Sequence, residues 1–328
     1  MSKGIGRLIN LGIAKEAARG TAESTASFWF QKLDADFNEK KTFARKEQSL
    51  GVIEAASGAD IVKAIAEGAI SIPLTDKTIG LILLSALGSV STQANTPEAS
   101  VHTHTFSVAQ NAQHPSLTYF IEDVLSGQDY KHALGMIQTL EIKYERGKFV
   151  EGAVTIRTKK GATATLTSSF TAENFFRSND FTFKLAANLA GLDAASAIQI
   201  KSLNLKIDKD LEDDDVLGSV DPVDILNKEF SVTGNLEAVF QNESDFKTQF
   251  LAGTAKAMRI DLQNNDVTIG SSTKPRLKID LASVIFSELT RALKNGDTVM
   301  QTLTFEGYYS LSDAKAITAV LINTQSSY

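Results

Sequence analysis

The chain has 328 residues, a formal net charge of -6 and no cysteine. The lack of cysteine excludes disulfides, thiolate metal sites and a cysteine nucleophile, so packing and assembly must stabilise the fold. An acidic chain of this kind lacks the concentrated Lys/Arg surface needed to bind nucleic-acid phosphates tightly. Its hydrophobic fraction of 43% supplies a sizeable core, and its many Phe, Thr, Val and Ile residues favour strands over helical bundles.

The apolar runs predict no membrane partner. The most apolar window, residues 79–87, is nine residues long, whereas a bilayer span needs roughly 20. Near the N-terminus the apolar runs are interrupted by glycine and charge, which argues against a signal peptide. We therefore expect a protein of the reducing cytoplasm.

The first third of the chain gives mixed signals. Residues 1–27 predict an N-terminal arm or first strand, with a short helix over 13–19 as the alternative, and residues 31–55 predict an exposed strand pair or loop. The Ala-rich stretch 55–70 has apolar residues at helical spacing and predicts a short helix between two glycines.

Residues 76–87 predict the clearest helix. They carry one apolar stripe, with Thr75 or Asp76 available to cap the start and Gly88 placed to end it. The small polar residues of 88–103 then predict a long loop or a flexible hairpin tip.

The segment 101–161 carries the strongest strand pattern. Leu140, Ile142 and Tyr144 alternate with Glu141, Lys143 and Glu145, which predicts a strand with one buried and one wet face. A turn at Gly147 and a second alternating run over 149–157 predict an antiparallel hairpin.

The rest of the chain predicts further strands. A similar pattern around 136–161 and 199–241 suggests a weak internal duplication, and hence two sheets of similar build that face each other. Residues 186–197 predict a loop, and 243–251 predict a second helix with Phe246 and Phe250 on one face. The remaining predicted strands cover residues 162–174, 181–185, 277–281, 299–309 and 316–323.

No motif for catalysis or metal binding is complete. His102 and His104 lie two apart in a Thr-rich run, where we expect two solvent-facing histidines rather than a zinc site. The acidic run 208–215 resembles the start of a calcium loop, but Asp213 and Ser219 stand where the loop needs Gly and Glu, so we expect a mobile connection. We therefore predict no enzyme, no metal and no cofactor.

Several segments resemble the tail tube (major tail) proteins of long-tailed, siphovirus-type bacteriophages. The resemblance is carried by LGIAKEAARGTA (11–22), EGAISIPLTDKTIGLILLSALG (67–88), HTFSVAQNAQHPSLTYF (104–120), IQTLEIKYERGKFVEGAVTI (137–156) and DFKTQFLAGTAKAMRIDLQN (245–264). It implies a single tail tube domain over 1–328, a mainly β fold of the sandwich or barrel type with one or two short flanking helices and long loops or arms, and a structural role in the virion tail.

The resemblance also implies the partners. The chain would form hexameric rings that stack into a hollow tube, meet the tape measure, tail terminator and distal tail proteins, and let genomic DNA pass without specific binding. Glu141, Lys143 and Glu145 are the candidate lumen-lining residues, although alternation shows only that they share a face and not where that face points. Assembly would take place in the host cytoplasm.

Three alternatives stay open at this stage. The chain could be the inner tube of a contractile tail or of a secretion-like particle, which the same resemblance allows. It could be a carbohydrate-binding β-sandwich or adhesin, although a single tryptophan, Trp29, makes a poor aromatic platform. A hydrolase would have to use scattered carboxylates as its acid and base.

Overall fold

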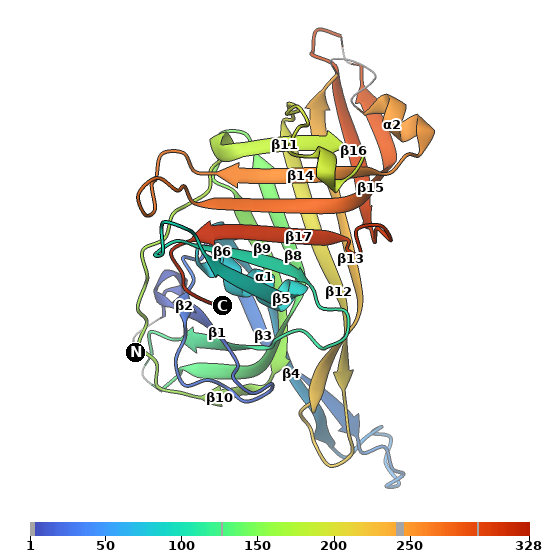
Figure 1. The fold of residues 1–328 in the computed structure, drawn as a ribbon. Helices are drawn as coiled ribbons and strands as arrows, with labels where there is room; N and C mark the ends of the chain where they lie inside the picture. The colour runs from blue at the N-terminus through green and yellow to red at the C-terminus, as the bar shows by residue number, and fades with distance from the viewer. Residues whose placement is uncertain (1–3, 126, 241–245, 294) are drawn as a thin grey trace.

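The computed structural model describes residues 4–125, 127–240, 246–293 and 295–328. The predicted fold class is confirmed: the chain is mainly β, its named strands pair antiparallel, and the described residues form two α-helices. Figure 1 shows two layers of strands that cross each other, with strands β11, β14, β17 and β6 in front of strands β9, β8, β12 and β13.

The main sheet contains eight strands. Every neighbouring pair in it is antiparallel, so its first and last strands run in opposite directions. In order across the sheet they are β3 (Asp34–Arg45), β4 (Ala59–Pro73), β9 (Glu151–Lys159), β8 (Tyr130–Glu145), β12 (Ser202–Asp214), β13 (Asp224–Val239), β16 (Met300–Tyr308) and β15 (Arg276–Ala292).

The second layer uses the first half of β15 and adds β11 (Phe181–Ala186), β14 (Lys256–Gln263), β17 (Ile317–Asn323), β6 (His102–Val108) and β5 (Gly88–Ala94). Strand β15 therefore belongs to both layers. Its residues 276–281 pair with β17, whereas its residues 283–292 pair with β16.

A smaller sheet closes one end of the molecule. It joins β1 (Asn10–Lys15), β2 (Phe28–Trp29) and β7 (Leu117–Glu122) to the start of β8, where β10 (Gly161–Thr163) also pairs. The remaining helical elements are short: η1 (Gly6–Leu8), η2 (Ser178–Asp180), η3 (Leu189–Gly191) and α2 (Lys247–Ala252).

Helix α1 (Thr78–Leu87) lies in the core, and all of its residues are buried. The sequence predicted this helix and its end at Gly88, whose φ of 97° is a conformation that glycine adopts readily. The predicted caps are wrong, because no side chain of Thr75 or Asp76 caps the first turn. Instead Glu173 accepts hydrogen bonds from the amide (3.0 Å) and hydroxyl (2.6 Å) of Thr78, which satisfies donors that a helix start leaves unpaired.

A buried lysine meets the other end of α1. Lys209 on β12 is 1% exposed, and its ammonium donates a hydrogen bond of 2.8 Å to the carbonyl of Ser85. The position suits a cation, because the last carbonyls of a helix carry partial negative charge. Burial, together with the nearby guanidinium of Arg19, nevertheless lowers the pKa of Lys209 to about 7.

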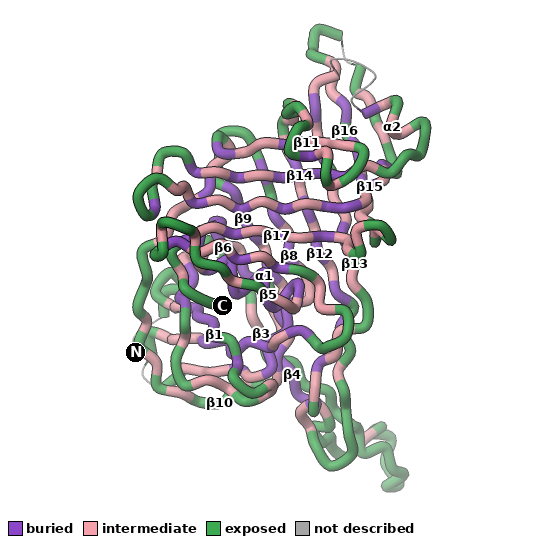
Figure 2. Tube along the Cα trace, viewed as in Figure 1, coloured by how far each residue is buried: buried purple, intermediate pink, exposed green. Residues whose placement is uncertain are grey.

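The core fills the space between the two layers. Figure 2 shows buried residues alternating along the crossing strands, while the projecting ends of the hairpins are exposed. One continuous cluster of buried apolar side chains links both layers and α1. Such continuity is expected of a single hydrophobic core.

Two helices that the sequence offered in its first third are absent. The helix over 13–19 is absent, because β1 occupies residues 10–15 and pairs with β7. The helix over 55–70 is absent, because β4 is hydrogen-bonded to β3 on one side and β9 on the other, and these ladders override the helix propensity of alanine. Residues 88–103, predicted as a long loop or a flexible hairpin tip, belong to a hairpin of β5 and β6, and only residues 95–101 form its tip.

Later predictions fare better. The hairpin of 140–157 is confirmed as β8 and β9, and strands are confirmed at 181–185, 277–281, 300–308 and 317–323. Of the strand predicted over 162–174, only its first two residues are in a strand, β10. The second helix starts at Lys247, and residues 243–245 of that prediction lie outside the described residues.

The predicted pair of facing duplicate sheets is wrong. β8 and β12 are neighbours in one sheet, with Leu140 opposite Ile207, so the two similar hairpins lie side by side. The acidic run is not a mobile loop either, because most of it belongs to β12.

The ring of Tyr328 fixes the packing of α1. Its hydroxyl donates to the carbonyl of Lys77 (2.8 Å) and accepts from Asn323 (2.7 Å), and a Cβ atom at Gly80 would lie 2.1 Å from its Cζ atom. We expect Gly80→Ala to lower the free energy of unfolding by about 1–3 kcal/mol through overpacking. Urea denaturation measures the change.

The matched background is Tyr328→Ala, which empties the space that the new methyl group needs. There Gly80→Ala should raise stability by up to about 1 kcal/mol, because alanine favours a helix more than glycine does. An equal loss in both backgrounds would show that the ring does not set the constraint.

Candidate functional site

The candidate lumen residues lie on β8, on the face of the main sheet that points away from the second layer. Leu140, Ile142 and Tyr144 are buried, whereas Lys143 and Glu145 are exposed and Glu141 is half-buried. The structure therefore places the three charged residues on one wet face, as the alternation predicted. Which side of an assembly this face lines stays a prediction.

Local partners hold these side chains in place. Glu141 accepts a hydrogen bond of 2.6 Å from Asn204 on β12 and lies 3.5 Å from the ammonium of Lys143. Glu145 pairs with Lys148 at 2.6 Å, and this contact lowers the pKa of its carboxyl. Exposed ion pairs of this kind contribute little to the stability of the fold, so stability alone does not explain these charges.

The face is acidic across six strands of the sheet, from β9 through β8, β12, β13 and β16 to β15. Residues that lie opposite each other on neighbouring strands share a face of the sheet. Starting from Thr139, Glu141, Lys143 and Glu145 on β8, the paired residues on the other strands form four rows along this wet face. Seven carboxylates stand in these rows against two lysines. The carboxylates are Glu141, Glu145, Glu151, Asp208, Glu237, Glu288 and Glu306, and the lysines are Lys143 and Lys206.

Both edges of the main sheet are free. In the described part of the chain β3 pairs only with β4, and residues 285–292 of β15 pair only with β16. A free edge presents unpaired N–H and C=O groups, which can bind a further strand. The sequence showed that 34–45 is exposed but gave no signal that it forms an edge, because edges depend on pairings between distant segments.

Three of the four histidines, His104, His114 and His132, are buried, and His102 is half-buried. His104 is buried, contrary to the expectation that it faces solvent, because β5 and β17 flank its strand. Its ring bonds to the hydroxyl of Thr92 (2.8 Å) and to Asn323 (3.0 Å). Burial lowers the pKa of His104, and it lowers the pKa of His114 to about 4, which leaves both rings neutral near pH 7. Within residues 4–125, 127–240, 246–293 and 295–328, no three or more His, Asp or Glu side chains are grouped to hold a metal ion.

The acidic run of β12 is tied to neighbouring lysines. Lys63 pairs with Asp213 (2.8 Å) and Asp215 (2.5 Å), and Lys228 pairs with Asp210 (3.2 Å). Each of these carboxylates is therefore paired with a lysine, and in the described residues no three of them are grouped, whereas a calcium ion takes six to eight oxygen ligands.

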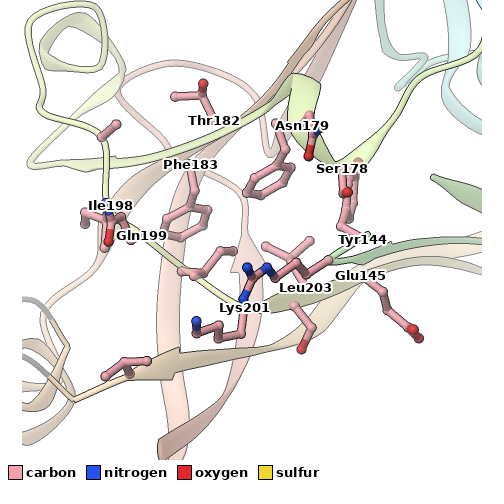
Figure 3. A pocket seen from close by; sticks show the side chains of 16 residues that line it. Tyr144, Glu145, Ser178, Asn179, Thr182, Phe183, Ile198, Gln199, Lys201 and Leu203 are labelled. Atoms are coloured by element: carbon pink, nitrogen blue, oxygen red, sulfur yellow. The ribbon is translucent and has the colours of Figure 1, made fainter. Parts of the chain in front are cut away.

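A pocket opens at the end where β8 finishes and β12 begins. Figure 3 shows Tyr144, Phe183 and Leu203, from three different strands, around this space. We call it the β11 pocket and define it by Tyr144, Phe181, Phe183, Ile198, Ile200 and Leu203; its volume is about 470 Å³. The hydroxyl of Tyr144 is buried and has no hydrogen-bond partner there. Trp29, by contrast, is buried against Phe120 and offers no exposed ring to a sugar.

Comparison with known proteins gives the family. The sequence profile of the phage tail tube protein family matches residues 6–307. No curated protein matches the chain. Among the described residues, no helix has the length and apolar character needed to cross a membrane. The tail tube family is a family of structural virion tail proteins that build a tube, and not a family of enzymes. Because the match covers nearly the whole chain, this protein belongs to the phage tail tube protein family.

Proposed function

We propose that this chain is the tail tube subunit of a long-tailed phage, which forms hexameric rings that stack into the conduit for DNA ejection. The observation that carries the proposal is the open main sheet, which has two free edges and one acidic face. The family match supports a structural tail tube role, and the sheet supplies a way to build the ring.

The two edges fit each other in direction. Since the sheet has an even number of antiparallel strands, β3 and β15 run in opposite directions. When copies are related by rotation about an axis along the strands, the second half of β15 in one copy meets β3 of the next as an antiparallel neighbour. The ladder then continues from copy to copy and closes.

The acidic face would line the lumen of such a ring. With six copies, the chain's -6 gives about -36 per ring, a field that repels phosphates rather than binding them. DNA could then slide, because few contacts hold its backbone. Glu141, Lys143 and Glu145 would lie on this inner wall.

The proposed partners follow the same role. Rings would assemble in the host cytoplasm around a tape measure protein and end against terminator and distal tail proteins. The mature tube would reside in the virion tail and contact DNA without reading its sequence.

Proline scanning of β3 tests ring closure. In a strand, successive N–H groups point to opposite sides, so Lys40→Pro and Lys41→Pro remove one N–H directed at β4 and one directed outward. Proline removes a ladder donor and is tolerated only at a free edge. We expect one variant to stay folded but monomeric by light scattering, while wild type forms rings and rods in electron micrographs.

Two results would contradict the proposal separately. If both variants formed rings like wild type, the β3 edge would have no part in closure. A tube structure with an inner wall dominated by Lys and Arg would refute the acidic lumen, whereas Glu141 and Glu145 on the outer wall would refute only their assignment.

A further inference from the structure

The turn between β12 and β13 exposes apolar and acidic side chains together. We call residues 214–221 the acidic tip; it carries Asp214, Asp215 and Asp221 and no basic residue. Leu217 is fully exposed at its centre, next to Gly218, which has a φ of 89°. A fully exposed leucine on a projecting turn buries no apolar surface within its own subunit. Exposed apolar groups that project in this way are typical of contact sites.

Part of the tip's charge is unpaired. Asp215 bonds to Lys63 and Asp221 lies 3.1 Å from Lys160, but Asp214 has no ion pair among the described residues. The tip therefore presents a leucine beside a free carboxylate.

The β11 pocket has the complementary character. Its lining combines aromatic and aliphatic side chains with small polar ones, and it includes two cations, Arg146 and Lys201, and one carboxylate, Glu145, which pairs with Lys148. Both cations are exposed, and neither has an ion pair in the described part of the chain. The buried hydroxyl of Tyr144 lacks a partner and could donate to a main-chain carbonyl of an incoming turn.

The tip and the pocket lie at opposite ends of the same strand. Ser202, the first residue of β12, lines the pocket, and Asp214, the last, begins the tip. Figure 1 shows the β12–β13 turn projecting from one end of the molecule while β11 lies at the other. Two different surfaces at opposite ends make a head-to-tail contact, which repeats without closing and so builds a filament.

We propose that the acidic tip of one subunit docks into the β11 pocket of the subunit that follows it along the tube, with Leu217 in the apolar lining and Asp214 beside Arg146 and Lys201. This inference rests on the proposed function, because it concerns the stacking of rings. It assigns the stacking contact to a definite segment and a definite pocket.

Assembly of purified full-length variants tests the contact. Leu217→Asp should leave rings intact by native mass spectrometry but raise the critical concentration for tubes at least tenfold in sedimentation. The matched control is Leu311→Asp, which changes another leucine that is 91% exposed, in the turn between β16 and β17. We expect that control to stay within twofold of wild type.

Charge reversal gives an independent readout. Arg146→Glu with Lys201→Glu should block stacking, Asp214→Lys should weaken it, and the triple variant should recover most of the tubes because opposite charges face each other again. Raising the salt concentration should weaken stacking of wild type, because salt screens the attraction, but it should not weaken the residual stacking of the single and double variants, whose facing charges repel.

The outcomes separate the two proposals. If wild type forms tubes and Leu217→Asp or the Arg146/Lys201 variant forms them equally well, the docking contact is overturned while the tube function stands. The docking contact is also overturned if Leu311→Asp is as damaging as Leu217→Asp, or if the triple variant shows no recovery. If wild type forms neither rings nor tubes, the proposed function fails.

Discussion

Replacing Lys209 with methionine is expected to stabilise the unassembled subunit by up to about 5 kcal/mol below pH 7 and to have progressively less effect as the pH rises toward 10. Burial lowers the pKa of this ammonium from 10.5 to about 7. Each tenfold change in proton affinity corresponds to roughly 1.4 kcal/mol, which gives the size of the effect.

The direction follows from proton binding. Between pH 7 and 10.5 the unfolded chain holds the lysine proton more tightly than the folded chain, so the stability of wild type rises with pH in that window. Below about pH 7 both states are protonated and the full penalty is present. Methionine has a similar length, keeps the packing and binds no proton.

Urea denaturation of wild type and Lys209→Met from pH 6 to 10 measures the difference between their free energies of unfolding. Titrating groups that the two proteins share contribute equally to both values and cancel. His114 lies beside Lys209 in the same pocket, but its pKa of about 4 keeps it neutral throughout this range. The matched control is Lys206→Met on the same strand, because Lys206 is partly exposed and pairs with Asp208 at 2.5 Å; it should change stability by less than about 1 kcal/mol. Parallel curves for wild type and Lys209→Met would show that the buried ammonium does not titrate in this window.

Glu16→Ala is expected to lower the free energy of unfolding by about 3–5 kcal/mol, the penalty for leaving several buried donors unpaired. Glu16 is 6% exposed and accepts hydrogen bonds from the amides of Gly20 (2.7 Å) and Leu134 (2.8 Å) and from the hydroxyls of Ser116 and Thr118. It thus joins β1, β7 and β8. Leu134 has a φ of 57°, which a leucine adopts only when its surroundings hold it there.

Two variants sharpen this test by thermal and urea unfolding. Glu16→Gln keeps one acceptor oxygen and should lose roughly half as much. Glu23→Ala removes a half-buried carboxylate that accepts one hydrogen bond, from the amide of Ala17 at 2.7 Å, and should lower the free energy of unfolding by less than about 1 kcal/mol. Equal losses of unfolding free energy for Glu16→Ala and Glu23→Ala would show that the buried hydrogen bonds of Glu16 do not stabilise the fold more than the single hydrogen bond of Glu23.

The local sequence pattern was enough to predict those elements whose structure depends mainly on residues close to them in the sequence. The β8–β9 hairpin and helix α1 carry clear periodicity and turn residues, and both were predicted. The alanines of β4 favour a helix in isolation, and they form a strand because β3 and β9 lie on either side of it. The helix and strand propensities of residues 59–73 alone do not show that two other strands flank this segment.

The candidate site also has one part that the local sequence pattern predicted and another that depends on contacts between distant segments. Alternation put Glu141, Lys143 and Glu145 on one face, but the acidity of that face depends on residues from five other strands, and these come together only in the fold. His104 is buried with Asn323, which lies 219 residues later in the chain, and the β11 pocket combines lining residues from Tyr144 to Val239. A single sequence read in windows cannot predict such long-range neighbours.

The double membership of β15 also sets the time at which the subunit can polymerise. One half of this strand completes the second layer and the other half forms an edge of the main sheet, and both are synthesised after more than four-fifths of the chain. Pairings between such distant segments form slowly, and partly made chains expose strands that aggregate. In the proposed ring, the β15 edge exists only once β15 has paired with β16, so a growing chain on the ribosome cannot yet offer this edge to the β3 edge of the next copy. Under that proposal, ring closure waits until translation of the subunit is nearly complete.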